Sequence, residues 1–257
     1  MTGTDVHTST YRRVPLSPVR RRTGERMVRA ATTIPHASIS VEVDYARVAA
    51  ARAALGPGWR AEHGTSLTYL PFILSALCVA IHEFPEVNAR LDGSDLLVAE
   101  RVHLGIAVDL GVNGLVVPVI HDADRLSVAD LALAVADLAR RARAKQLTPA
   151  DVTGATYTVT NPGPFGTYAS APIINPPQAA ILAVDGIAKR PVVTSDGPDD
   201  RIEIRPMGLL TQAFDHRVFD GAYCAAFLHR LRTLIADTDW VAAFARSPVT
   251  TEDREKP

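Results

Sequence analysis

The sequence is poor in lysine, in cysteine and in long apolar runs. Only three of its 27 basic residues are lysines, at positions 145, 189 and 256, so a cofactor attached to lysine has few possible sites. The two cysteines, Cys78 and Cys224, lie far apart in apolar stretches, which argues against a disulfide framework or a cysteine zinc site and favours reduced cytosolic thiols. No uninterrupted apolar run reaches the roughly 18–20 residues that a membrane span needs.

An excess of charge of one sign is also missing. The formal net charge is −1, so no overall field attracts nucleic acid or an anionic membrane. The N-terminal residues contain no apolar stretch typical of a secretory signal. We therefore expect a cytoplasmic protein with neither a nucleic-acid nor a membrane partner.

What the sequence does contain is typical of one globular domain. Hydrophobic residues make up 47% and charged residues 21%, which is sufficient for a substantial core. There is no repeat and no long linker, so residues 11–247 are predicted to form a single catalytic domain. The polar residues 1–10 and the charged residues 248–257 are predicted to be disordered tails.

Hydrophobic periodicity and breaker residues predict a mixture of helices and strands. The predicted helices cover residues 20–29, 71–81, 127–145 and 222–235, and the predicted strands cover residues 36–44, 104–109, 115–120, 156–160, 179–184 and 209–214. Such a mixture indicates an α/β or α+β sandwich, although local pattern alone does not fix its topology.

The segment DHRVFDG, residues 215–221, lies where a predicted strand ends and a predicted helix begins. A rigidly held histidine at such a junction suits general-base catalysis, because the unperturbed pKa of imidazole is near neutrality. Asp215, Arg217 and Asp220 can pair with this ring, with each other or with distant arginines. A lone histidine is more often structural, so the residues by themselves leave both interpretations open.

The pattern HxxxDG resembles the signature shared by chloramphenicol acetyltransferases and the catalytic domains of dihydrolipoamide acyltransferases. Further segments resemble the second group in the same order along residues 13–235. They are TYLPF (68–72), FPEVNA (84–89), GIAVDLGVNGLVVPVI (105–120), QLTPADVTGATYTVTNPGPFG (146–166) and INPPQAAILAV (174–184). The resemblance implies a chloramphenicol acetyltransferase-like fold, with a mixed sheet flanked by helices.

The resemblance also implies roles for three residues. His216 matches the general base, Thr160 matches the hydroxyl that donates to the oxyanion, and Asp220 matches an aspartate that supports the site. It implies a homotrimer or a multiple of trimers, with histidine and hydroxyl supplied by neighbouring subunits. Coenzyme A, as acetyl-CoA, is expected as a substrate, with no metal and no covalent acyl-enzyme. The sequence assigns no residue to CoA contact.

The identity of the acyl acceptor is inferred from segments that are not recognisable in the sequence. No lipoyl domain or Ala/Pro-rich linker is recognisable, and none of the three lysines resembles a lipoylation site. We therefore expect a complete, freestanding enzyme that moves acetyl to a hydroxyl of a small-molecule, tetronate-like natural product. The alternatives are the catalytic core of a 2-oxoacid dehydrogenase complex, transferring acyl groups between dihydrolipoamide and CoA, and a non-catalytic assembly scaffold.

Overall fold

The computed structural model describes residues 11–111, 114–195 and 199–244, so both predicted tails, 1–10 and 248–257, lie outside the described residues. Its centre is a seven-stranded mixed sheet in the order β1-β11-β9-β8-β4-β7, with β10 also paired to β11. The strands of this sheet are β1 (His36–Asp44), β4 (Leu104–Ile106), β7 (Val119–Ile120), β8 (Tyr157–Thr160), β9 (Ala180–Val184), β10 (Ala188–Thr194) and β11 (Arg201–Asp215). Two small sheets pair β2 (Ala89–Asp92) with β3 (Asp95–Val98) and β5 (Val108–Asp109) with β6 (Leu115–Val116).

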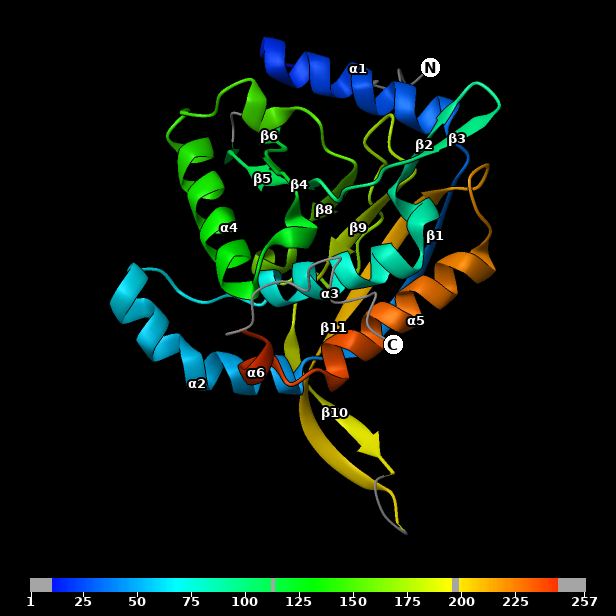
Figure 1. The fold of residues 1–257 in the computed structure, drawn as a ribbon. Coiled ribbons are helices and arrows are strands. Elements are labelled where there is room, and N and C mark those ends of the chain that lie inside the picture. Colours follow the sequence, from blue (N-terminus) through cyan, green and yellow to red (C-terminus); the bar gives the residue numbers. More distant parts are fainter. Residues whose placement is uncertain (1–10, 112–113, 196–198, 245–257) are drawn as a thin grey trace, which may run out of the picture.

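Most helices cover one face of the central sheet (Figure 1). They are α2 (Ala46–His63), α3 (Leu70–Glu83), α4 (Val128–Arg143), α5 (Gly221–Asp237) and α6 (Trp240–Phe244). Side chains alternate between the two faces of a strand, so Leu210 and Phe214 of β11 join the main hydrophobic core on this face. Through this core, α5 packs mainly against β1 and also contacts β11.

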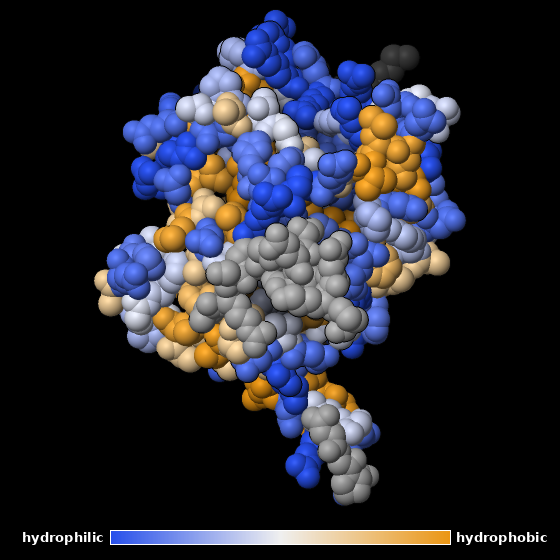
Figure 2. All heavy atoms as spheres, viewed as in Figure 1, coloured by the Kyte–Doolittle hydropathy of each residue, from blue (hydrophilic) through white to orange (hydrophobic). Residues whose placement is uncertain are grey.

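The opposite face of the sheet is partly covered by α1 (Pro18–Thr33), at the top of Figure 1. Ala30 near its end and Ile34 just after it form a small separate apolar cluster with Ile174, Ile181 and Ala213. The rest of α1 is hydrophilic, with five arginines and a single acid, and Figure 2 shows this hydrophilic surface at the top of the molecule. This face of the sheet therefore has a much smaller apolar core than the other.

The predicted α/β sandwich with a mixed sheet and flanking helices is confirmed, as is the predicted strand at residues 36–44. Several features differ from the expectation. The predicted strand 104–109 divides between two sheets, as β4 and β5, and the last strand begins at Arg201 rather than near residue 209. The extra length of β11 pairs with β10 in a hairpin that projects from the body (Figure 1).

Candidate active site

A network of hydrogen bonds holds the turn formed by residues 215–217, called here the DHR turn, at the end of β11. The Asp215 side chain is almost fully buried and accepts hydrogen bonds from the Arg217 backbone N–H and from its guanidinium, at 2.6 Å from Nη2 to Oδ2. This pairing raises the pKa of Arg217. The His216 backbone N–H donates to the Pro35 carbonyl at 3.1 Å, and the Val218 N–H donates to the Asp215 carbonyl. The backbone on both sides of His216 is thus fixed, as a positioned catalytic group requires.

The His216 ring itself is half exposed and faces a carboxylate. Its Nδ1 lies 3.5 Å from Oδ1 of Asp220, and the ring centroid lies 5.5 Å from that of Phe214. Asp220 is the N-cap residue of α5, yet its side chain makes no capping hydrogen bond. An N-cap aspartate usually accepts from the first turn of its helix. Here that carboxylate is instead directed toward the histidine.

Thr160 lies on the other half of the sheet, well separated from His216 in the same chain. It is the last residue of β8 and pairs in register with Ala183 of β9. Ala183 in turn pairs in register with Thr211 of β11. His216 directly follows the end of β11 and is five residues beyond Thr211, which corresponds to about 17 Å along the strand direction at about 3.4 Å per residue. The Thr160 hydroxyl is half buried and has no hydrogen-bond partner within the described part of the chain. The structure thus brings His216 and Asp220 together but does not bring Thr160 to them.

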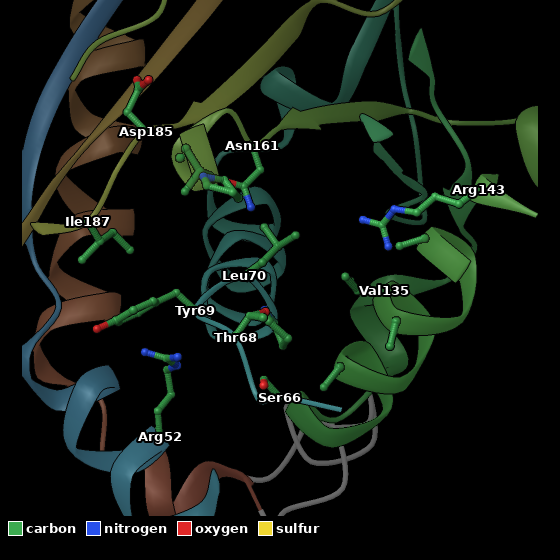
Figure 3. A pocket seen from close by; sticks show the side chains of 17 residues that line it. Arg52, Ser66, Thr68, Tyr69, Leu70, Val135, Arg143, Asn161, Asp185 and Ile187 are labelled. Carbon is green, nitrogen blue, oxygen red and sulfur yellow. The ribbon is translucent and has the colours of Figure 1, made fainter. Parts of the chain in front are cut away.

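A cavity of about 450 Å³ opens beside the residue that follows Thr160. It is bounded by α4, by residues 66 and 68–71, which lead into α3, and by Asn161 (Figure 3). Two arginines line it. Arg52 donates to the Leu67 carbonyl at 2.8 Å and lies 4.0 Å over the Tyr69 ring, whereas Arg143 has no acidic partner within the described ranges. The cavity is therefore suited to an anionic ligand with an extended apolar part.

One acidic residue, Asp185, also lines this cavity, but its carboxylate is already hydrogen-bonded to Thr167 and Ser170. Sequence reasoning missed Arg52, Arg143 and Asp185. For Asp185 a signal existed, because a charged residue directly after the buried strand AILAV requires partners. For the two arginines no local signal existed, since they come from different helices.

Neither cysteine has the character of a nucleophile. Cys224 is fully buried on α5, and burial raises its pKa to about 12. Burial also raises the pKa of Cys78. Both thiols therefore stay protonated near neutral pH, and a protonated thiol is a poor nucleophile. Among the residues that the structure describes, no group of three or more histidine, cysteine or acidic side chains is arranged to hold a metal ion, and no helix is long and apolar enough to cross a membrane.

The mixed sheet with its helical layer is a chloramphenicol acetyltransferase-like fold, and a histidine is held at the end of its strand β11. The chain belongs to the family described as 2-oxoacid dehydrogenases acyltransferase (catalytic domain), whose model matches residues 8–242. A solved chloramphenicol acetyltransferase, at 15% identity and a TM-score of 0.51, shares the fold alone.

Curated relatives are components of 2-oxoacid dehydrogenase complexes. The dihydrolipoyllysine-residue succinyltransferase component of the 2-oxoglutarate dehydrogenase complex of Haemophilus influenzae is 36% identical over 88% of this chain and 54% of the relative. The lipoamide acyltransferase component of the branched-chain alpha-keto acid dehydrogenase complex of Bacillus subtilis is 37% identical over 88% of this chain and 52% of the relative. The chain thus spans about half the length of the curated relatives it matches.

Solved structures give the same result. A probable dihydrolipoamide acetyltransferase from Listeria monocytogenes has a TM-score of 0.85 at 34% identity, covering 93% of this chain and 99% of that one. The dihydrolipoamide acetyltransferase of Azotobacter vinelandii has a TM-score of 0.84 at 32% identity, covering 92% and 96%; a serine, a histidine and an asparagine were studied for their roles in its catalytic mechanism. The cubic core of a pyruvate dehydrogenase multienzyme complex matches equally well, with the same TM-score, identity and coverage.

These relatives overturn one expectation from the sequence. The main hypothesis, a freestanding acetyltransferase for a tetronate-like natural product, is wrong, because the similar proteins belong to 2-oxoacid dehydrogenase complexes. The physical reason is that a general base and an oxyanion donor serve a thiol or an alcohol equally well. The motif therefore does not identify the acceptor, and the hypothesis depended on segments that the sequence does not contain.

Proposed function

We propose that this chain is the catalytic core of a dihydrolipoamide acyltransferase, which moves an acyl group between dihydrolipoamide and CoA. The observation that carries the proposal is the half-exposed His216 ring on a backbone held by the DHR turn, within a chain whose relatives are named as lipoamide or dihydrolipoyllysine-residue acyltransferases. In the Azotobacter vinelandii relative, the histidine and the asparagine studied are four residues apart, the same spacing as His216 and Asp220.

His216 is the general base in this proposal. The Asp220 carboxylate near Nδ1 favours the tautomer that carries its proton there, which leaves the Nε2 lone pair free to accept one. When the CoA thiol attacks the thioester carbonyl of acyl-dihydrolipoamide, Nε2 takes the thiol proton. The tetrahedral intermediate then collapses, the bond to the dihydrolipoamide sulfur breaks, and the same proton passes to that leaving thiolate.

Thr160 donates a hydrogen bond to the oxyanion of this intermediate, and it does so from a second copy of the chain. Within one chain the two residues are about 17 Å apart along the strand direction. A hydrogen bond to the oxyanion requires a donor at about 2.7–3.1 Å. The unpaired Thr160 hydroxyl on the less covered face of the sheet supports a site shared between subunits, as in the expected trimer.

The acceptor is tested directly with free substrates. We expect the protein to transfer an acyl group from acetyl-CoA, succinyl-CoA or a branched-chain acyl-CoA to free dihydrolipoamide, because its relatives act in complexes of all three kinds. CoA release and S-acyl-dihydrolipoamide formation are measured together, with a simple alcohol as the control acceptor. Transfer to the alcohol but to no thiol, or CoA binding with no transfer at all, contradicts the proposal.

The cavity beside Asn161 binds the phosphate-bearing part of CoA in this proposal, and Arg143 supplies charge to it. Replacing Arg143 with alanine is expected to raise the KM for CoA about 10-fold with little change in kcat, as for the loss of one exposed charge-assisted hydrogen bond. Arg140→Ala is the matched control, because Arg140 lies on the same helix, is paired with Asp137 and does not line the cavity. An equal rise in both variants contradicts the assignment.

A further inference from the structure

Asp185 is a buried carboxylate whose partners all come from one loop. It directly follows β9 and is 1% exposed. Its oxygens accept hydrogen bonds from the Thr167 hydroxyl at 2.7 Å, the Ser170 hydroxyl at 2.6 Å and the Ser170 backbone N–H at 3.0 Å. No lysine or arginine lies within ion-pair distance of it in the described ranges. The loop of residues 161–170 alone therefore satisfies this charge.

The backbone of the same loop packs tightly against Asp185 and the residue after it. The Gly186 N–H donates to the Thr167 carbonyl at 2.8 Å. A Cβ added to Gly163 would lie 2.8 Å from the Asp185 carbonyl oxygen, and one added to Gly186 would lie 2.7 Å from the Thr167 carbonyl oxygen. Only glycine fits at both positions, so the loop is held by backbone contact as well as by the carboxylate.

Burial of a carboxylate without a cation is unfavourable, and only short, charge-assisted hydrogen bonds offset it. An apolar side chain in the same place would avoid this cost. The arrangement nevertheless gives the loop one defined position, because three donors must reach two oxygens at once. A hydrophobic contact is non-directional and would not fix the loop in this way.

The position of this loop matters because of what it adjoins. It begins directly after Thr160, the last residue of β8, and contains the short 3₁₀ turn Gly163–Phe165. Asn161, Gly163 and Asp185 all line the cavity between α4 and the start of α3 (Figure 3). A displaced loop would shift both the end of β8 and one wall of this cavity.

We propose that Asp185 is a positioning residue for acyl transfer: by fixing the loop of residues 161–170, it sets the position of the Thr160 hydroxyl and of the cavity wall that CoA contacts. It touches no reacting atom and acts through the loop. This inference rests on the proposed function, since it assigns Asp185 to the step in which Thr160 meets the oxyanion.

The test replaces Asp185 with asparagine, which keeps the shape but removes the charge and leaves one oxygen as an acceptor. We expect kcat to fall about 10- to 100-fold, because a small misplacement of a catalytic group has an effect of this size. The KM for CoA should rise, while the KM for dihydrolipoamide stays within about twofold. Hydrogen exchange at the Ser170 amide should become about 10-fold faster, because a neutral amide oxygen is a weaker acceptor than a carboxylate oxygen.

A second variant covers the case in which Asp185→Asn does not fold. Thr167→Val removes one hydroxyl donor, leaves the carboxylate with its two Ser170 donors, and should reproduce the fall in kcat in weaker form. The matched control is Asp200→Asn, because Asp200 also accepts from a serine hydroxyl, Ser195, at 2.7 Å, but lies exposed at the end of the β10–β11 hairpin. It should leave kcat, both KM values and Ser170 exchange unchanged.

Two results overturn the inference. One is faster hydrogen exchange at Ser170 with kcat and the KM for CoA unchanged. The network would then stabilise the loop without affecting catalysis. The other is a uniform acceleration of exchange throughout β8 and β9, which would mean general destabilisation. Failure of the proposed function is a separate result, because then the unsubstituted protein transfers no acyl group to dihydrolipoamide.

Discussion

Replacing His216 with alanine is expected to lower kcat for acyl transfer by about 10²–10⁴-fold, the usual contribution of a positioned general base. The thiol then has to lose its proton to water while it attacks the thioester. The KM values should change little, because the ring contributes to the transition state rather than to ground-state binding. Steady-state kinetics with acetyl-CoA and dihydrolipoamide measure both quantities.

His229→Ala is the control for this experiment, since His229 is an exposed histidine on α5, the helix that follows the DHR turn. It should retain full activity. Folding of the His216 variant is checked by its thermal transition, which should be close to that of the unsubstituted protein because the ring is half exposed. A kcat within about threefold of the unsubstituted value in a folded His216→Ala protein would contradict the general-base role.

Replacing Thr160 with alanine is the second large effect, with an expected loss of about 10²–10³-fold in kcat for one oxyanion donor. Thr160→Ser should recover most of the activity, because it keeps the hydroxyl and removes only a methyl group. The hydroxyl has no partner within the described part of the chain, so its loss leaves no unpaired group and should hardly change stability. Equal activity of the alanine and serine variants would remove Thr160 from the mechanism.

Mixing the two inactive variants tests whether the site is shared. In a closed oligomer assembled at random from equal amounts of His216→Ala and Thr160→Ala chains, about a quarter of the interfaces pair an intact histidine with an intact threonine. Co-folded mixtures should therefore recover about a quarter of the original activity, whereas each variant alone stays inactive. No recovery in a co-folded oligomer would mean that both groups act within one chain, which the strand register argues against.

The sequence predicted the local elements well wherever short-range chemistry decides them. Alternation over residues 36–44 gives β1 with the same bounds. The predicted helix 127–145 corresponds to α4, with Ser127 as its N-cap in a full capping box with Asp130. It missed α2, where Gly56, Pro57 and Gly58 interrupt the helical pattern. Tertiary packing overrides those breakers, because Val48, Ala51 and Trp59 are buried in the main core.

The sequence likewise predicted only part of the candidate site. DHRVFDG by itself points to a histidine at a junction of strand and helix, and the structure places His216 there, with Asp220 beside it. Sequence could not predict that Asp215 is the buried partner of Arg217 rather than of the ring. That choice depends on which face of β11 each side chain occupies and on what covers that face.

The amino-acid sequence alone predicted the α/β class and placed a histidine at a junction of strand and helix, because both depend on residues that are close together in the chain. Only the tertiary structure decided where the other groups lie. Strand register separates Thr160 from His216, and packing brings Asp185, Arg52 and Arg143 from separate elements to one cavity. The reason is physical: local preferences act over a few residues, whereas these distances arise from pairings between segments far apart in the chain.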